Sequence, residues 1–319
     1  MTGRANVAAS VKQRLLNLAR QRGEEFNLIL VRYGIERLLY RLSRSVHGSD
    51  FVLKGAMLFH LWTAAPHRPT RDVDLLGRGT PDRARLEDVF RSVCATPVDE
   101  DGLDFLPESV RADRIRDDAE YEGIRVLLDA RLGSARLRLQ IDVGFGDAVV
   151  PPPERVEFPV LIDQPAPRLS VCRRETVVAE KLQAMVDLGL TNSRMKDFFD
   201  IRFLATTFDF LGPDLMRAID ATFTRRHMPL PRGVPTALTD EFATDEVKRT
   251  QWRAFLHRSR LVREKLELAS VVSELRAFLL PPLEALVTGR PFERIWTAGG
   301  PWREKTEPRR GQSGSEVRA

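Results

Sequence analysis

Two aspartates of this sequence, Asp72 and Asp74, have the spacing that a catalytic metal site requires. Side chains alternate between the two faces of a β-strand, so both carboxylates would face one side while Val73 faces the core. Carboxylate oxygens are preferred ligands of Mg2+, which keeps coordination positions open for nucleotide phosphates. The pair therefore predicts a magnesium site suited to phosphoryl or nucleotidyl transfer.

A third carboxylate, Asp142, is expected on the polar face of another strand. That strand is predicted from a strict alternation whose apolar members are Leu137, Leu139, Ile141 and Val143. If it lies beside the strand of Asp72 and Asp74, three carboxylates converge, as two-metal transfer requires. The alternative for Asp142 is a surface aspartate on an amphipathic strand. Asp147 is expected to close the turn that follows.

Residues around the two aspartates could bind nucleotide phosphates, namely Lys54, Gly55, Arg68, Thr70 and Arg71. Gly55 would let the backbone approach phosphate oxygens at the start of a helix, although a glycine before any helix gives the same pattern. Arg68 and Arg71 could clamp phosphates bidentately, or simply offset the repulsion between the carboxylates. Thr70 would face the same side as Asp72 and bind a phosphate or a metal-bound water, unless it is an ordinary strand threonine.

Lys181 interrupts the apolar stripe of a predicted helix over residues 174–188. A lysine on a core-facing stripe must reach water or an anionic partner, and a nucleotide phosphate would supply that partner. An ion pair with Asp197 or Asp200 is the alternative. Both aspartates open the next helix, where they could orient Lys181 or help to deprotonate the acceptor. Otherwise Asp197 favours the helix dipole and Asp200 pairs with Lys196 on the surface.

The hydrophobic periodicity predicts helices mixed with strands, followed by helices alone. The first group comprises a helix at 7–45, a strand at 51–53, a helix ending at 62, a strand at 71–76, a helix at 81–94, hairpin arms at 123–132 and 136–145, and a strand near 158–162. Residues 97–120 are acidic and are expected to be mostly irregular. The second group comprises helices at 174–188, 195–206, 213–225, 245–258 and 267–287.

This order of elements predicts an α+β fold, with a mixed sheet between N-terminal helices and a C-terminal helical domain. The expected boundaries are N-terminal helices at 1–48, a sheet-containing core at 49–165, a helical domain at 166–300 and a tail at 301–319. The tail is polar and almost without apolar residues, so it is expected to be disordered.

Composition and charge limit the classes of protein to consider. The 319 residues carry a net charge of +5 with a pI near 9.5, which permits a nucleic-acid partner without requiring one. Basic residues gather in the C-terminal half, either as a binding surface or as helix faces neutralised by glutamates. The sequence shows no signal peptide and no apolar segment of membrane length, and its two cysteines have no metal-ligand spacing, so a cytoplasmic protein is expected. The sequence shows no zinc-ligand spacing, nucleophile elbow, Walker loop or Rossmann glycine pattern. Hydrolases with a nucleophile elbow and P-loop enzymes are therefore disfavoured.

Four blocks, taken in order, resemble the AbiEii/AbiGii toxin family of nucleotidyltransferases, the toxic half of abortive-infection toxin–antitoxin pairs. The blocks are Lys54-Gly55 with Arg68-x-Thr70-x-Asp72-x-Asp74, Ile141-Asp142-Val143 with Gly146-Asp147, Ala179-Glu180-Lys181, and Lys196-Asp197-Phe-Phe-Asp200. They span residues 54 to 200, and the last third of the chain resembles the family only in being helical.

The resemblance implies a DNA-polymerase-β-like nucleotidyltransferase fold, dependence on Mg2+ and a nucleoside triphosphate (NTP) as substrate. It also implies that Asp72 and Asp74 are catalytic metal ligands. Lys181 would bind the triphosphate, and Asp197 would be a later catalytic carboxylate. Asp142 fits the third acidic position of the wider superfamily.

One departure from the superfamily is Ala56, which stands where a serine often follows the glycine. The contact of that serine hydroxyl with phosphate is therefore missing here or is supplied by Thr70.

The expected function is that of a toxin that transfers a nucleotide from an NTP to an RNA acceptor, with the 3′ end of tRNA as the expected target. A cognate antitoxin is the expected protein partner. The alternatives are the same chemistry on a small molecule or a protein hydroxyl, and a non-catalytic nucleotide-binding module.

Overall fold

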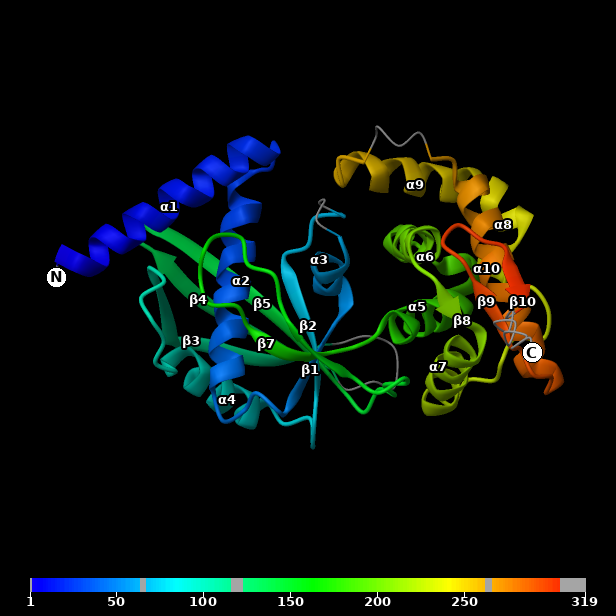
Figure 1. Cartoon of the computed structure of the whole chain (residues 1–319), viewed down its shortest axis with the longest axis horizontal. Helices are drawn as coiled ribbons and strands as arrows, with labels where there is room; N and C mark the ends of the chain where they lie inside the picture. Colours follow the sequence, from blue (N-terminus) through cyan, green and yellow to red (C-terminus); the bar gives the residue numbers. More distant parts are fainter. Residues whose placement is uncertain (1, 64–66, 116–122, 262–265, 305–319) are drawn as a thin grey trace, which may run out of the picture.

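The computed structural model describes residues 2–63, 67–115, 123–261 and 266–304. A seven-stranded mixed sheet, with the order β3-β4-β5-β2-β1-β7-β6, organises the first part of the chain (Figure 1). Its strands are β1 (Phe51–Lys54), β2 (Asp72–Gly77), β3 (Leu103–Ile115), β4 (Gly123–Leu132), β5 (Ala135–Phe145), β6 (Glu154–Glu157) and β7 (Arg168–Val171). Since β2 is parallel to β5 and antiparallel to β1, the strand that carries Asp72 and Asp74 lies in the middle of the sheet.

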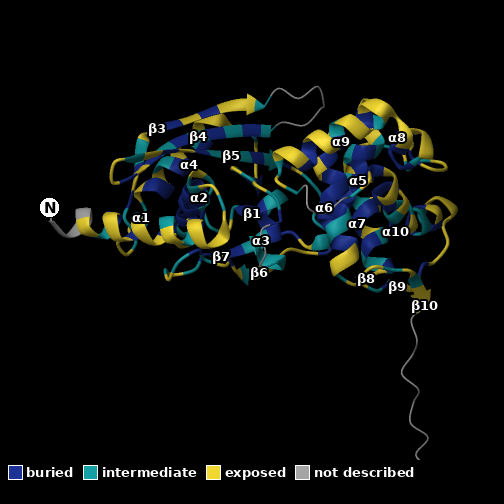
Figure 2. Ribbon diagram, turned by 90° about the horizontal axis from the view of Figure 1, so that it is seen from above, coloured by how far each residue is buried: buried dark blue, intermediate teal, exposed yellow. Residues whose placement is uncertain are grey.

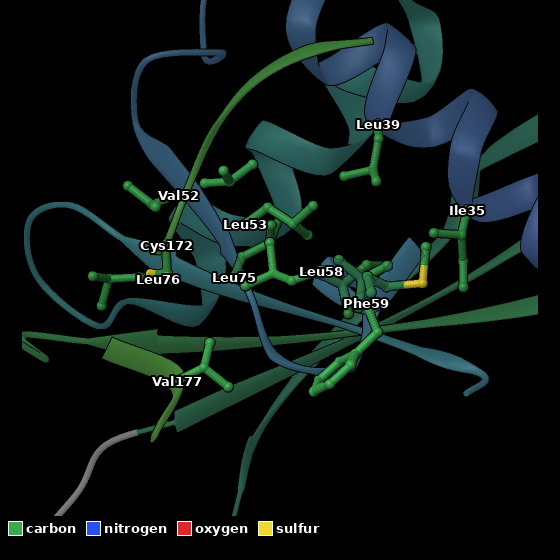
Figure 3. Packing of buried hydrophobic residues seen from close by; sticks show 14 of the residues in the cluster. Ile35, Leu39, Val52, Leu53, Leu58, Phe59, Leu75, Leu76, Cys172 and Val177 are labelled. Atoms are coloured by element: carbon green, nitrogen blue, oxygen red, sulfur yellow. The ribbon is translucent and has the colours of Figure 1, made fainter. Parts of the chain in front are cut away.

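Helices of the first part are α1 (Thr2–Arg22), α2 (Phe26–Arg44) and α4 (Arg83–Ala95). Figure 3 shows the core that α2 forms with the sheet, where Ile35 and Leu39 join the buried strand residues Leu53 and Leu75. Each fully buried side chain of this kind contributes about 1.5–3 kcal/mol. Because side chains alternate along β2, the packing that directs Leu75 toward α2 directs Asp74 to the opposite face.

The second part of the chain is mainly helical, as predicted. Its helices are α5 (Arg174–Leu188), α6 (Met195–Thr207), α7 (Gly212–Arg225), α8 (Asp240–Thr244), α9 (Glu246–Arg258) and α10 (Leu268–Thr288). Figure 2 shows this part beside the large sheet, with α5 and α6 drawn largely as buried. A small sheet of β8 (Phe210–Leu211), β9 (Arg294–Trp296) and β10 (Trp302–Glu304), in the order β10-β9-β8, completes it. The α+β class predicted from the sequence is confirmed.

The predicted hairpin is also confirmed. β4 and β5 pair antiparallel from Ile124 with Val143 to Leu132 with Ala135, around Gly133, whose φ of +57° suits a tight turn. The helices predicted at 174–188 and 195–206 match α5 and α6 within a residue. Cys94 and Cys172 are buried and form no disulfide, as expected of core cysteines.

The expectation of a mostly irregular segment at residues 97–120 is wrong. β3 is a thirteen-residue strand paired with β4. A β-bulge between Leu106 and Arg111 shifts its register. Buried side chains therefore occupy odd-numbered positions before the bulge and even-numbered positions after it: Leu103, Phe105, Val110 and Ala112. Each part of β3 alternates buried and exposed residues, but the bulge shifts the alternation by one residue. The whole segment therefore shows no single period of two from which a strand could be predicted.

The N-terminal helix predicted at 7–45 is two helices. Gly23, with a φ of +64°, lies between α1 and α2 and allows the chain to turn. The strand expected near 158–162 is replaced by β6 and β7 on either side of it. β7 pairs with β1 in the large sheet, so the sheet extends past the boundary predicted at residue 165.

The predicted tail begins too early. Trp302 of β10 stacks on Phe278 of α10, with ring centroids 5.8 Å apart. Its indole nitrogen donates a hydrogen bond of 2.9 Å to the Phe278 carbonyl. The remaining part of the predicted tail, residues 305–319, lies outside the described residues.

Candidate active site

Four charged residues form one row across the central strands of the sheet. Lys54 on β1 pairs in register with Asp74 on β2, which pairs with Asp142 on β5. Arg125 on β4 is the register partner of Asp142. Paired residues point to the same face, so the row lies on the face opposite the α2 core. The expectation that the strand of Asp142 adjoins that of Asp72 and Asp74 is confirmed.

The row faces a cavity of about 570 Å3 whose other walls come mainly from α5, the start of α6 and Arg226 after α7 (Gly212–Arg225). This volume falls within the range of about 300–1,000 Å3 that is usual for small-molecule sites. The acidic lining residues are Asp72, Asp74, Asp142 and Glu180. The basic lining residues are Lys54, Arg68, Arg125, Lys181, Arg194, Lys196 and Arg226. Cations outnumber carboxylates, which suits a polyanionic ligand.

Gly55 leaves the space that the Asp74 carboxylate occupies. Its φ is +71°, and a Cβ atom at this position would lie 1.9 Å from Asp74 Oδ2. The chain continues from Gly55 into a 3-10 turn and the short helix α3 (Phe59–Trp62), as predicted. Burial and the charge of Asp72 raise the pKa of Asp74 to about 6. A cation between the two carboxylates would oppose this shift, because it favours their charged forms.

Thr70 positions Asp72 directly. Its hydroxyl donates a hydrogen bond of 2.6 Å to Asp72 Oδ1. Arg71, in contrast, is exposed, and the described lining of the cavity does not include it. Of the two arginines predicted to clamp phosphates, only Arg68 therefore lies at the cavity.

Asp142 lies at the cavity but is engaged by Arg125. The guanidinium donates Nε to Oδ1 and Nη2 to Oδ2, both at 2.8 Å. Asp72 and Asp74 offer the carboxylate oxygens that Mg2+ prefers, whereas Asp142 would first have to exchange Arg125 for the metal. Accordingly, in the described part of the chain no group of three or more His, Cys, Asp or Glu side chains is arranged to hold a metal ion. The donor set fits Mg2+ through two carboxylates.

Lys54 belongs to an ion-pair cluster at the edge of the cavity. Its Nζ lies 2.5 Å from Asp147 Oδ2 and 2.8 Å from Glu180 Oε1. Burial alone would lower the pKa of Lys54, but Glu180 and Asp147 outweigh it and raise that pKa. Asp147, expected only to close a turn, also pairs with Arg226 at 3.1 Å. Glu180 was not predicted as a site residue, although it directly precedes Lys181 in one of the four blocks.

Lys181 is held between two fully buried carboxylates of α6. Its Nζ lies 2.6 Å from Asp197 Oδ1 and 2.8 Å from Asp200 Oδ2. The ion pair considered as the alternative for Lys181 is thus present, and it involves both aspartates. Arg68 contacts Asp200 bidentately at 2.8 Å, and Arg194 lies 2.8 Å from Asp197. The surface pair of Asp200 with Lys196 is therefore wrong, because Asp200 is entirely buried.

His67 completes this cluster and was not predicted from the sequence. Its Nε2 lies 2.9 Å from Asp200 Oδ1, and its ring stacks on Phe59 at 4.1 Å. Burial would raise the pKa of Asp200, but Lys181 and Arg68 hold it well below its usual range. Burial lowers the pKa of His67, so a neutral imidazole donates Nε2–H to an ionised Asp200. A lone histidine before Arg68 gave no signal of this role.

Basic residues of α9 are partly neutralised within their own helix. Arg249 and Arg253 pair with Glu246 at 3.3 and 3.1 Å. Lys248 is buried and donates a hydrogen bond of 3.1 Å to the Asn192 carbonyl. For these residues, helix faces neutralised by glutamate describe the arrangement better than a binding surface does.

Two solved structures are similar to this chain. A putative nucleotidyltransferase from H. pylori shares 14% identity and has a TM-score of 0.44, with 80% of this chain and 94% of that chain covered. JHP933 from Helicobacter pylori shares 16% identity and has a TM-score of 0.42, with coverages of 79% and 90%. Among curated proteins none matches the sequence.

Within the described residues, every helix is too short or too polar to cross a membrane.

The family described as "Nucleotidyl transferase AbiEii toxin, Type IV TA system" matches residues 37–281, where TA stands for toxin–antitoxin. This match covers most of the chain and includes the charged row, the Lys181 cluster and the helices around them. The chain belongs to the AbiEii nucleotidyl transferase toxin family of type IV toxin–antitoxin systems.

Proposed function

We propose that the protein transfers a nucleotide from an NTP to an RNA acceptor, the 3′ end of tRNA, in a Mg2+-dependent reaction. The observation that carries this proposal is the placement of Asp72, Asp74 and Asp142 on one wall of a cavity whose other walls are basic. Carboxylates that bind cations and basic residues that bind phosphates match the two parts of a metal–triphosphate complex.

Asp72 and Asp74 would hold Mg2+, and Asp142 would become a third ligand by exchanging Arg125 for the metal. When bound, the metal would neutralise triphosphate charge and activate the acceptor hydroxyl. The protein fixes the carboxylates in advance, because Thr70 binds Asp72 and Gly55 leaves room for Asp74. Such pre-positioning lowers the entropic cost of assembling the reacting groups.

The Lys181 cluster would bind the triphosphate. Lys181, Arg68 and Arg194 line the cavity and hold two buried carboxylates, so one positive charge remains in excess at this wall. A triphosphate can use that charge through charge-assisted hydrogen bonds. Asp197 is fully buried and contacts Lys181 and Arg194, so we assign it to positioning these cations.

A polyanionic acceptor agrees with the charge of the molecule. The net charge of +5 and the basic walls of the cavity favour RNA over a neutral small molecule.

The test is transfer of label from each of four radiolabelled NTPs to bulk tRNA, with Mg2+ or with EDTA. Wild-type protein should label tRNA with Mg2+ alone, and Asp72→Asn should reduce the rate by at least about 100-fold. The matched control is Asp104→Asn, which changes an exposed aspartate and should leave the rate unchanged. Equal labelling by wild type and Asp72→Asn would reject the proposal. Label found only on added aminoglycosides or on protein would identify a different acceptor.

A further inference from the structure

A second, smaller cavity lies next to the active site, on the other side of Arg68. It has a volume of about 220 Å3 and is lined by the α1–α2 junction, the segment 67–70 and the end of α9. In Figure 1 the α1–α2 turn and one end of α9 approach each other near α3. Arg68 lines both cavities, and Thr70 lines the second one while binding Asp72 of the first. The two cavities are therefore neighbours.

Cations outnumber carboxylates in this second cavity. Its lining contains four arginines and two glutamates, namely Arg22, Arg32, Arg68, Arg260, Glu24 and Glu25. Arg68 is neutralised by Asp200. Glu24 approaches Arg22, and Glu25 approaches Arg260, each at 3.9 Å. The cation left over is Arg32.

Arg32 lies on α2 at the wall of the cavity and is partly buried. Within the described residues its guanidinium has no hydrogen bond and no carboxylate within 4 Å. Burial and the charge of Arg22 lower the pKa of Arg32 to about 10, against the opposing effect of Glu24 and Glu36. A partly desolvated cation of this kind is stabilised by any anion that enters the cavity.

His60 adds a neutral hydrogen-bonding group to the same cavity. Burial and the charge of Arg32 lower the pKa of His60 to about 3, so its imidazole is uncharged at neutral pH. A guanidinium next to a neutral imidazole suits an anion with several oxygen atoms, because guanidinium donors match phosphate geometry. The chemical class of the ligand is therefore a phosphate group.

The size of the cavity limits how much of a ligand it can hold. A volume of about 220 Å3 corresponds to roughly seven waters at about 30 Å3 each. It is smaller than the range of about 300–1,000 Å3 that accommodates whole ligands, so it suits one phosphate or a sugar-phosphate but not an NTP. The cavity of about 570 Å3 has the size for the NTP.

We propose that the Arg32 cavity binds a backbone phosphate of the acceptor strand whose 3′ end reaches the neighbouring active site. This assignment rests on the proposed transfer to RNA. Arg32 would then hold the acceptor rather than the donor, and its removal would weaken RNA binding without affecting NTP binding.

The experiment measures binding without turnover. A fluorescent RNA stem-loop with a single-stranded 3′ end is titrated with protein at several salt concentrations, in the absence of NTP. Arg32→Gln should weaken binding about 5- to 50-fold and lower the slope of log K against log salt by about 1. Arg32→Lys should restore the salt slope but only part of the affinity, because the charge returns without the guanidinium geometry. The matched control Arg44→Gln, an exposed arginine at the other end of α2, should bind as wild type does.

The affinity for a fluorescent NTP analogue should stay within twofold of wild type in Arg32→Gln. Unchanged RNA binding by Arg32→Gln, with tRNA labelling intact in wild type, would overturn the inference and leave the proposed function standing. An equal loss of NTP and RNA binding would also overturn it, since Arg32 would then serve the donor. If wild type neither binds nor labels RNA, the function and the inference both fail. Thermal stabilisation by inorganic phosphate that is lost in Arg32→Gln would then reassign the cavity to free phosphate.

Discussion

At the scale of single residues, the carboxylate pair depends on the side chain that position 55 lacks. Gly55→Ala would place a Cβ where Asp74 Oδ2 lies and would strain a backbone with φ +71°. We expect nucleotidyl transfer to fall by at least about 100-fold and stability by about 1–3 kcal/mol. The control is Gly289→Ala, which has a φ of +64° and no atom within 4 Å of the added Cβ. It should lose similar stability and keep full activity; loss of activity there would show that backbone strain alone explains the effect.

Glu36 on α2 makes stability depend on pH. Burial raises the pKa of Glu36 to about 7, while its carboxylate accepts a 2.7 Å hydrogen bond from Leu161 N. A raised carboxyl pKa favours the neutral form in the folded state, so its contribution is complete below about pH 4.5 and is lost as the pH rises through 7.

Glu36→Gln should therefore flatten the stability profile between pH 5 and 8, with a gain of up to about 3 kcal/mol over wild type at pH 8. Urea unfolding at a series of pH values measures this. Glu241→Gln changes an exposed glutamate and should leave the profile unchanged. A wild-type profile that is already flat would contradict the raised pKa.

The sequence located the reactive residues better than their partners. A lysine inside an apolar stripe required an anion, and that requirement follows from the α5 pattern alone. Which anion it meets depends on how α6 packs against α5 and on where the segment of His67 and Arg68 passes, and neither is encoded in local periodicity. For the same reason the sequence left open whether Asp200 pairs with Lys181 or with Lys196 on the surface, whereas three cationic or imidazole groups from other elements surround it.

At the scale of elements, Asp101 links the segment before β3 to α2 through buried ion pairs. Its carboxylate lies 3.2 Å from Arg37 Nε and 2.5 Å from Arg41 Nη1, and all three side chains are buried. Asp101→Ala would leave two buried guanidinium groups without this counter-ion. We expect a loss of about 3–5 kcal/mol in the free energy of unfolding, measured with urea. Asp104→Ala, at an exposed position of β3, should stay within about 0.5 kcal/mol of wild type.

Elements were predictable where a single hydrophobic period extends over ten or more residues, even where one charged residue such as Lys181 interrupts it. The helices α5 and α6 and the β4–β5 hairpin carry regular patterns over ten or more residues. β3 carries two patterns separated by a bulge, and β6 and β7 have four residues each. Four residues are too few to establish a period, so pairing with β1 rather than local sequence defines β7 as a strand.

At the scale of the whole molecule, the Lys181 cluster connects the sheet to the helical part. It joins α5 and α6 to the segment before β2 through Arg68 and His67. Lys181→Met would remove one of the positive charges that neutralise the buried carboxylates of Asp197 and Asp200. We expect a loss of about 3–5 kcal/mol in unfolding free energy together with loss of nucleotidyl transfer. Asp72→Asn should lose the transfer alone; loss of activity without loss of stability in Lys181→Met would argue against this connecting role.

The assembly of the site could be predicted only in part. The alternation on β5 placed Asp142 on a polar face, and the resemblance placed Asp142 at the third acidic position of the superfamily, while the position of its strand beside β2 remained a condition. The register that sets Asp142 beside Asp74 depends on pairing between β2 and β5, which are more than sixty residues apart in the sequence. The ion pair of Asp142 with Arg125 depends on the exact register of the β4–β5 hairpin. Such pairing is a property of the folded sheet, which no single segment specifies.

The row of Lys54, Asp74, Asp142 and Arg125 makes the site sensitive to the number of residues in β2. Since successive side chains alternate faces, inserting one residue between Asp74 and Leu75, with Leu75–Gly77 kept in register, would turn both aspartates into the α2 core and Val73 into the cavity. Inserting two residues would restore the faces and only displace the carboxylates along the strand. Insertions of an odd number of residues in this strand should therefore abolish folding. Insertions of an even number should allow folding but misalign the carboxylates with their partners in the row.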